Sequence, residues 1–475
     1  MGRSVYTGIY EPEHPTANDR GFRKDVADLV RELGPTCVRY PGGNFVSGYK
    51  WEDGVGPRDE RPVRLDAAWR GLETNAVGLH EFAEWAEDVD LEVMMAVNLG
   101  TRGAAEAAEL LEYCNLETPT TRVAQRRANG AAAPFRIRTW CLGNEMDGEW
   151  QIGHKTADEY GRLAAETARL MRFVDPGVEL VLAGSSSAEM PTFGEWERTV
   201  LRHVGDLADH ISLHAYYEET DDVRDFLASS RRLDRFIGDV AQIVAEVEAE
   251  LGLTKRIGIS VDEWNVWRTT QFNQVDKEPL LNGPWRFHAP VIEDDYTVTD
   301  AVVVGSLLHT LLRRADRVKI ANQAQLVNVI APIRTEKGGN AWRQTVFYPF
   351  AITAAYARGE VVELQVDGPM FESGRYGETP AIDAVATRAG DALEVFVAHL
   401  DTDVDIDVNI QLDGFRLLSA TTLSAPEDGD RLTVNSAEAQ TVHPRPLPVL
   451  SGATTITLPA VSWTHMRFAA NTVDV

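Results

Sequence analysis

The sequence predicts an α/β protein, a (β/α)₈ TIM barrel followed by a C-terminal antiparallel β-sandwich. Three observations indicate this fold class. Strand-like and helix-like segments alternate over about the first three-quarters of the chain, as in βαβ units around a parallel sheet. Nearly every one of these strands ends in polar residues. From about residue 360 the pattern changes to short alternating runs separated by Gly, Pro and Asp, which is typical of a β-sandwich.

The first predicted helix covers residues 21–33, where Phe22, Val26 and Leu29 share one face and Gly34 suits its end. Strands and helices alternate after it. We expect strands at residues 36–43, 91–100, 137–145, 178–187, 209–217, 256–267 and 317–327. We expect further helices near residues 79–89, 104–113, 156–174, 232–251, 299–314 and 344–358.

This strand count is one short of a complete eight-stranded barrel. The helix at 21–33 has no clear strand before it, and the segment "RSVYTGIY" offers only two or three apolar positions for an inward face. We therefore expect the first barrel strand to be missing unless this segment supplies it. The change of pattern places the domain boundary at Arg358–Gly359, with a catalytic barrel over 1–358 and the sandwich over 359–475.

A doubly wound open sheet is the alternative for the first part of the chain. Such a sheet would collect functional residues at one switch point, whereas a barrel gathers all strand ends around one mouth. The polar strand ends are spread over the whole alternating region, which favours the barrel. They are Arg39, Asn98, Glu145, Ser185, His214, Glu263 and Gln325.

Composition excludes several function classes. The 475 residues include 46 basic and 73 acidic side chains, giving a formal charge of −27. Neither nucleic acid nor an anionic membrane attracts such a protein. The three cysteines lack metal-ligand spacing, and no signal peptide or membrane-spanning segment is visible, so we expect a cytoplasmic protein.

Glu145 and Glu263 each follow an apolar strand, in the contexts "WCLGNE" and "ISVDE". In a barrel both carboxylates would lie at the same mouth. Two facing carboxylates, one protonated and one ionised, are what glycoside hydrolysis requires. Each glutamate alone is as easily a surface acid, but their matching contexts favour a catalytic pair.

The segment "HAYY" supplies further polar groups at another strand end. His214 and Tyr216 are two residues apart and so point to the same face, where both could contact one carboxylate. A lone histidine is more often a structural group, and no metal-ligand spacing lies nearby. Five of the eleven tryptophans lie near the predicted mouth, where they could stack on sugars or simply fill the core: Trp51, Trp140, Trp150, Trp264 and Trp267.

With these residues in place, the chain resembles the α-L-arabinofuranosidases of glycoside hydrolase family 51. The matching segments occur in order along essentially the whole chain: "VYTGIYEPEHP", "RYPGGNFVSGYKWEDGVGP", "MMAVNLGTRG", "WCLGNEMDGEWQIGHKTA", "ISLHAYY", "DEWNVW" and "AQLVNVIAP". The resemblance implies a (β/α)₈ barrel, a C-terminal β-sandwich and often a homohexamer. It also implies an N-terminal strand with a sugar-binding glutamate, which would precede Met1.

Carried over residue by residue, the resemblance assigns Glu145 as the acid/base and Glu263 as the nucleophile of a retaining mechanism. It assigns sugar contacts to Asn44, Asn144, Tyr216, Trp267 and Gln325, and supporting roles to Arg39 and His214. It implies no cofactor and no metal. The implied activity is exo-acting removal of terminal α-L-arabinofuranosyl residues from arabinose-containing oligosaccharides, as in arabinan degradation.

Two other functions remain open from the sequence alone. The first is a glycosidase of different specificity on the same scaffold, since some relatives act on β-linked glucans or xylans. The second is an inactive, N-terminally truncated homologue that only binds arabinose-containing oligosaccharides. The preferred linkage does not follow from the sequence.

Overall fold

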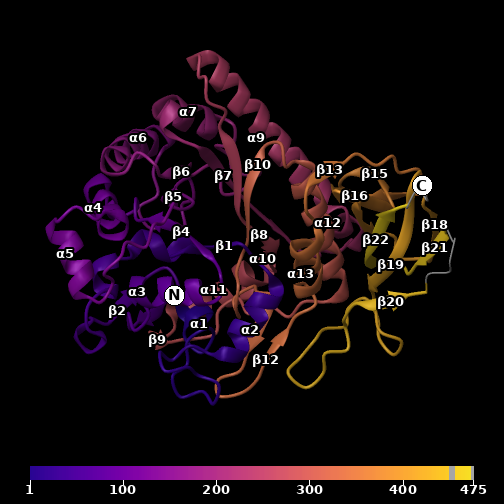
Figure 1. The fold of residues 1–475 in the computed structure, drawn as a ribbon, viewed down its shortest axis with the longest axis horizontal. Coiled ribbons are helices and arrows are strands. Elements are labelled where there is room, and N and C mark those ends of the chain that lie inside the picture. Colours follow the sequence, from indigo (N-terminus) through magenta and orange to yellow (C-terminus); the bar gives the residue numbers. More distant parts are fainter. Residues whose placement is uncertain (449–454, 472–475) are drawn as a thin grey trace.

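The computed structural model describes residues 1–448 and 455–471. A seven-stranded parallel sheet forms its centre, with the strand order β1-β4-β5-β6-β7-β8-β10 (Figure 1). The strands are β1 (Cys37–Tyr40), β4 (Glu92–Val97), β5 (Thr139–Leu142), β6 (Glu179–Leu182), β7 (His210–Tyr217), β8 (Gly258–Val266) and β10 (Val318–Gln323). This order follows the chain, as a barrel requires, and confirms the barrel over the doubly wound sheet.

The barrel contains the seven strands expected from the sequence and is open between β1 and β10, the two ends of the strand order. Residues 3–10 do not supply an eighth strand. Gly2–Val5 form the short helix α1, and Tyr6 and Tyr10 take part only in isolated bridges. The expectation that this segment could serve as a strand is therefore wrong, in keeping with its few apolar positions.

Helices surround the sheet on its outside (Figure 1). The main ones are α2 (Lys24–Leu33), α3 (Leu79–Asp88), α4 (Ala104–Asn115), α6 (Ala157–Val174), α7 (Glu195–Val204), α9 (Ser229–Leu251), α12 (Val298–Arg313) and α13 (Phe347–Tyr356). Helix α2 ends at Gly34 in the left-handed conformation, as predicted. Helix α6 begins with a capping box between Thr156 and Glu159.

The sequence did not predict several connecting elements. Among them are α5 (Thr121–Ala128), α7, α8 (Val223–Leu227) and α11 (Lys277–Asn282), together with a three-stranded sheet of β2 (Arg64–Asp66), β3 (Gly71–Glu73) and β9 (Arg286–Phe287). Most of these elements lie in the loops around the barrel. Within the described residues, no helix is long and apolar enough to cross a membrane.

Antiparallel sheets follow the barrel, as predicted. A six-stranded sheet has the order β13-β16-β17-β22-β19-β20, and two-stranded sheets β14-β15 and β18-β21 accompany it. The strands are β13 (Glu360–Val362), β14 (Met370–Ser373), β15 (Gly377–Pro380), β16 (Ile382–Ala389), β17 (Ala392–His399), β18 (Ile406–Asn409), β19 (Phe415–Leu423), β20 (Arg445–Leu447), β21 (Thr455–Leu458) and β22 (Ser462–Ala470). Residues 449–454 and 472–475 of the predicted sandwich lie outside the described residues.

Helix α12 packs between the barrel and the six-stranded sheet (Figure 1). His309 of α12 is fully buried, and its Nε2 accepts a hydrogen bond from the indole N–H of Trp463 at 3.1 Å. Its Nδ1 lies 3.1 Å from Oδ2 of Asp383, and Arg313 binds the other oxygen of Asp383 at 2.7 Å. These contacts specify a neutral histidine that donates through Nδ1, and they fix the sheet against the helix.

Asp383→Asn should therefore lower the free energy of unfolding by about 1–3 kcal/mol, because the buried Nδ1–H of His309 and the guanidinium of Arg313 lose their shared charged acceptor. Urea unfolding followed by circular dichroism measures the loss. Asp316→Asn is the matched control, since the ion pair of Asp316 with Arg256 is exposed and should contribute almost nothing. Equal midpoints for both variants would contradict the prediction.

Candidate active site

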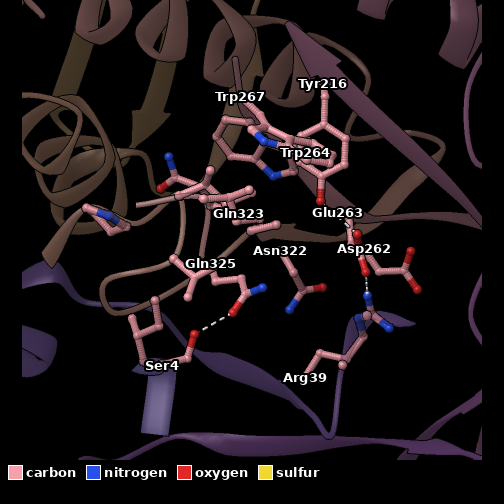
Figure 2. Close-up of a pocket in the computed structure, with 18 of the residues that line it drawn as sticks. Ser4, Arg39, Tyr216, Asp262, Glu263, Trp264, Trp267, Asn322, Gln323 and Gln325 are labelled. Carbon is pink, nitrogen blue, oxygen red and sulfur yellow. Dashed lines mark hydrogen bonds and ion pairs between the residues drawn. The ribbon is translucent and has the colours of Figure 1, made fainter. Parts of the chain in front are cut away.

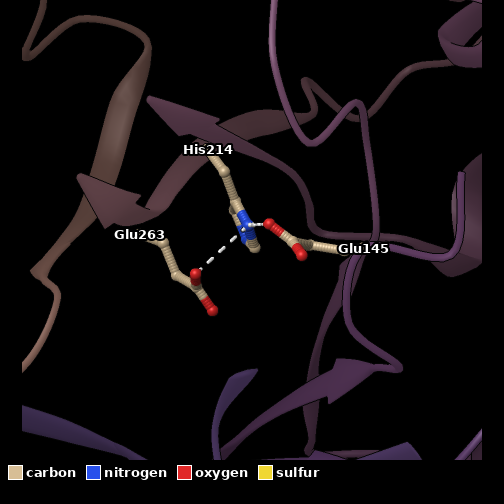
Figure 3. Close-up of side chains that lie close together, drawn as sticks. All are labelled: Glu145, His214 and Glu263. Atoms are coloured by element: carbon tan, nitrogen blue, oxygen red, sulfur yellow. Dashed lines mark hydrogen bonds and ion pairs between the residues drawn. The ribbon is translucent and has the colours of Figure 1, made fainter. Parts of the chain in front are cut away.

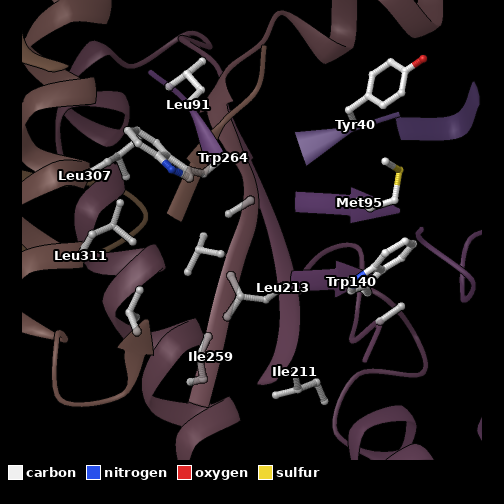
Figure 4. Packing of buried hydrophobic residues seen from close by; sticks show 14 of the residues in the cluster. Tyr40, Leu91, Met95, Trp140, Ile211, Leu213, Ile259, Trp264, Leu307 and Leu311 are labelled. Carbon is white, nitrogen blue, oxygen red and sulfur yellow. The ribbon is translucent and has the colours of Figure 1, made fainter. Parts of the chain in front are cut away.

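The two glutamates predicted as a catalytic pair come together at one end of the barrel. Glu145 follows β5, and Glu263 lies within β8. Carboxylate oxygens of Glu145 and Glu263 and a ring nitrogen of His214 all lie within 4.8 Å of one another (Figure 3). Glu145 adopts a positive φ of 43°, a backbone conformation that is uncommon for non-glycine residues.

His214 of β7 lies between the carboxylates. Its Nδ1 is 3.0 Å from Oε1 of Glu145 and 3.5 Å from Oε2 of Glu263. Its Nε2 is 2.9 Å from Oδ1 of Asp262. Burial alone would lower the pKa of His214, but the negative charges of Glu263, Asp262 and Glu145 raise that pKa well above its ordinary value. Carboxylates therefore engage both ring nitrogens, as a doubly protonated imidazole requires.

Arg39 and Tyr216 bind the carboxylate of Glu263 from two further strands (Figure 2). Arg39 of β1 forms an ion pair with Oε1, and the hydroxyl of Tyr216 of β7 donates to Oε2 at 2.7 Å. Burial and the nearby charge of Glu263 raise the pKa of Tyr216 well above its ordinary value, so the phenol keeps its proton. These two donors orient the carboxylate of Glu263.

A cavity of about 1230 Å³ opens beside the two glutamates, and four of the residues predicted to contact the sugar line it: Asn44, Tyr216, Trp267 and Gln325. Buried Asn144 accepts a hydrogen bond from Arg39 at 3.1 Å, and its Nδ2 has no partner among the described residues. Trp267 meets Tyr216 edge to face, with ring centroids 5.1 Å apart. Asn44 and Gln325 line the cavity, and Oε1 of Gln325 accepts a hydrogen bond from Ser4 at 2.6 Å (Figure 2).

Family models match most of the chain. The model described as "Alpha-L-arabinofuranosidase 1 domain" matches residues 29–235. The model described as "Alpha-L-arabinofuranosidase C-terminal domain" matches residues 262–462. Both catalytic candidates fall within these matches.

Full-length relatives show the family. An intracellular exo-α-(1→5)-L-arabinofuranosidase of Streptomyces lividans is 52% identical over 99% of this chain and 72% of its own length. An exo-α-(1→6)-L-arabinofuranosidase of Bifidobacterium longum is 51% identical over 98% of this chain and 92% of its own length. The chain belongs to the α-L-arabinofuranosidases of glycoside hydrolase family 51.

Solved structures of family members agree with this assignment. AbfB, a family 51 α-L-arabinofuranosidase from Bifidobacterium longum, superposes with a TM-score of 0.93 at 45% identity, covering 98% of this chain and 94% of the other. The α-L-arabinofuranosidase of Thermotoga maritima, solved with arabinose, gives a TM-score of 0.86 at 31% identity with the same coverage of both chains.

Three residues of this arabinofuranosidase site were not assigned from the sequence. Asp262 contacts His214, but nothing in the sequence distinguished this acid from any other next to Glu263. The indole N–H of half-exposed Trp150 donates to Oε2 of Glu145 at 2.7 Å. Asp147 is buried close to Glu145. The acid-rich run "NEMDGEW" was the available signal for the last two. By contrast, Trp51, Trp140 and Trp264 are buried in the core.

Asp147 is a buried acid whose charged form is unfavourable in the folded protein. One carboxylate oxygen accepts from the backbone N–H of Ser186 at 3.0 Å and from its hydroxyl at 3.1 Å, while Oδ1 has no partner among the described residues. Burial, with the charge of Glu145, raises the pKa of Asp147 to about 6. Since the unfolded chain ionises first as pH rises, Asp147 destabilises the fold progressively between pH ~4 and ~6, and fully above.

Asp147→Asn should therefore stabilise the fold by about 1–3 kcal/mol at pH 7.5, because asparagine can accept from Ser186 without carrying a charge. The gain should be smaller at pH 5, where the wild-type carboxyl is largely protonated. Urea unfolding at the two pH values measures both quantities. A gain that does not grow with pH, or a loss at pH 7.5, would contradict this account.

Proposed function

We propose that Glu145 is the acid/base and Glu263 the nucleophile of this exo-acting α-L-arabinofuranosidase. The observation that carries the proposal is the approach of the two carboxylates to within 4.8 Å. Retaining glycosidases hold their carboxyl groups about 5–5.5 Å apart, whereas inverting enzymes need about 6.5–9.5 Å to admit a water molecule. The short separation favours double displacement with retention.

In the first step, Glu263 attacks the anomeric carbon while Glu145 protonates the departing glycosidic oxygen. The contacts of Arg39 and Tyr216 orient the carboxylate of Glu263 before attack. Trp150 would have to release Oε2 of Glu145 if that oxygen is the one that delivers the proton. The step forms a glycosyl ester on Glu263 and frees the leaving group as an alcohol.

In the second step, Glu145 removes a proton from the incoming water, which attacks the same anomeric carbon and breaks the ester bond. Esterification has by then removed the negative charge of Glu263. Glu145 gave its proton to the leaving group in the first step, and without a second negative charge nearby it stays a carboxylate that can act as the base. Arabinose leaves with its original anomeric configuration, and Glu145 is protonated again.

We assign sugar binding to Asn44, Asn144, Tyr216, Trp267 and Gln325, with Arg39 and His214 supporting the carboxylates. Nδ2 of Asn144 is a buried donor without a partner among the described residues, which suits a contact with a sugar hydroxyl. Trp267 contributes an apolar wall beside Tyr216. Sugars combine such apolar faces with hydroxyls, so this lining fits a furanose ring.

The test is the stereochemistry of the first product. Proton NMR during hydrolysis of 4-nitrophenyl α-L-arabinofuranoside should show α-arabinofuranose before mutarotation. Initial formation of the β anomer would overturn the double displacement. A parallel panel of aryl xylosides and glucosides should remain uncleaved, which separates this function from that of a glycosidase of other specificity.

Finer properties of the enzyme are proposals as well. We propose short arabinose-containing oligosaccharides, as in arabinan degradation, as natural substrates. The two relatives described above support this, because they are named exo-α-(1→5)- and exo-α-(1→6)-L-arabinofuranosidases. The relative of Streptomyces lividans is named intracellular, which supports a cytoplasmic location. We also propose a domain boundary at Arg358–Gly359, between α13 and β13, and a homohexamer. Light scattering coupled to gel filtration tests the hexamer.

A further inference from the structure

Asp262 is a buried acid that the mechanism above does not use. It lies in β8 directly before Glu263, and its Oδ1 is 2.9 Å from Nε2 of His214. Within the part of the chain that the structure describes, its Oδ2 has one hydrogen-bonding partner, the thiol of Cys141 at 3.9 Å, which is a weak contact. A carboxylate with so few donors is costly to bury unless it has a strong ionic partner. His214 is that partner.

We propose that Asp262 is a positioning residue that keeps both ring nitrogens of His214 as donors and thereby holds Glu145 by one oxygen. The chain of contacts runs from Asp262 Oδ1 through the imidazole to Oε1 of Glu145. Oε1 is thus engaged by the ring N–H. Among residues 1–448 and 455–471, Oε2 has the half-exposed Trp150 as its single hydrogen-bond partner and is left to carry the transferable proton.

The charges around the imidazole support this arrangement. The charged and titratable groups of the cluster come from four strands and the loop after β5: Arg39, Cys141, Glu145, Asp147, Tyr216, Asp262 and Glu263. Arg39 pairs directly with Glu263 and interacts with Asp262 only through its nearby charge, so His214 is the group in hydrogen-bond contact with both Asp262 and Glu145. Asp262 is the one carboxylate in contact with this buried ring that the proposed reaction does not use. If Asp262 were neutral, a positive charge on the ring would lose that partner and become costly.

Loss of Asp262 has a specific consequence for catalysis. A neutral imidazole can place its single proton on either nitrogen, so Nδ1 no longer has to donate to Glu145. The imidazole lies between Asp262 and Glu145, so the lost positive charge is nearer to Glu145 than the lost negative charge. Glu145 should then keep its proton to higher pH and be held in more than one orientation.

This inference rests on the proposed acid/base role of Glu145, and the first experiment compares pH profiles. In Asp262→Asn, kcat for 4-nitrophenyl α-L-arabinofuranoside should fall ~10-fold or more with little change in KM, and the alkaline limb of kcat/KM should move up by ~0.5–1 pH unit. Asp383→Asn breaks an Asp–His pair outside the active site and should leave the acidic and alkaline limbs of the kcat/KM profile unchanged. Asp262→Glu, which keeps the charge, should restore the wild-type limb.

Coupling to His214 provides a second comparison. The double variant Asp262→Asn/His214→Asn should have the same alkaline limb as His214→Asn alone, because Asp262 acts through the ring. A fall in kcat with unmoved limbs, or an effect of Asp262→Asn that persists without His214, would assign Asp262 a purely structural role and overturn the proposal.

An independent measurement reads the protonation of His214 in the wild-type enzyme and needs no variant to turn over. Nitrogen-15 NMR of histidine-labelled wild-type enzyme, with His214→Asn used only to assign the signal, reports the protonation of each ring nitrogen. Both nitrogens of His214 should be protonated at pH 7. A neutral ring would overturn the proposal even if the enzyme is active, whereas a cationic ring in an inactive enzyme would instead count against the proposed function.

Discussion

Glu263→Ala should lower kcat for 4-nitrophenyl α-L-arabinofuranoside by ~10⁴-fold or more, because no glycosyl ester can form without the nucleophile. The variant also leaves Arg39 and the hydroxyl of Tyr216 without their shared acceptor. The substitution also removes the carboxylate that stabilises positive charge at the anomeric carbon. Steady-state release of nitrophenol measures the loss, and circular dichroism confirms that the variant is folded.

Chemical rescue separates a lost nucleophile from a damaged site. Azide can enter the space that the shortened side chain leaves and attack the anomeric carbon in its place, giving the β-configured arabinofuranosyl azide. Glu149→Ala, an exposed glutamate four residues after Glu145, is the matched control and should retain nearly full activity. Undiminished hydrolysis in Glu263→Ala would remove Glu263 from the mechanism.

The sequence was most informative where side-chain periodicity is strong. Each of the seven barrel strands lies within its expected range, because a buried parallel strand and an amphipathic helix differ clearly in apolar spacing. Glu145 and Glu263 could be paired once those strands were recognised, because the carboxyl ends of the parallel strands of a barrel lie around one mouth. Short elements such as α5 and β9 could not be predicted, because they have too few residues to show a period.

The contacts within the site depend on register, which local sequence does not encode. The pairing of β7 with β8 contains an irregularity between Ser212 and His214, and beyond it His214 lies opposite Glu263. That shift helps bring the imidazole among Asp262, Glu263 and Glu145. Without the register, Asp262 is one more acid beside a candidate nucleophile. Likewise, the hydrogen bond from Ser4 to Gln325 joins residues 321 positions apart.

Glu145→Ala should have an effect that depends on the leaving group. An arabinose-containing oligosaccharide needs full protonation of its glycosidic oxygen, so kcat/KM should fall by ~10²–10⁴-fold. A 2,4-dinitrophenyl arabinofuranoside departs without an acid, so its kcat/KM should fall far less. With this substrate the glycosyl ester on Glu263 still forms but is hydrolysed slowly, because no base activates water. A burst of dinitrophenol followed by a slow steady state is the expected time course.

Azide then distinguishes the two carboxylates by stereochemistry. In Glu145→Ala it needs no base, attacks the ester carried by Glu263 and should release the α-configured azide, opposite to the product expected from Glu263→Ala. His214 should remain bound to Asp262 in this variant, since that contact does not involve Glu145. Equal losses for both leaving groups, or a β-configured azide, would contradict the assignment. The pair of azide products therefore fixes which carboxylate attacks carbon and which one carries the proton.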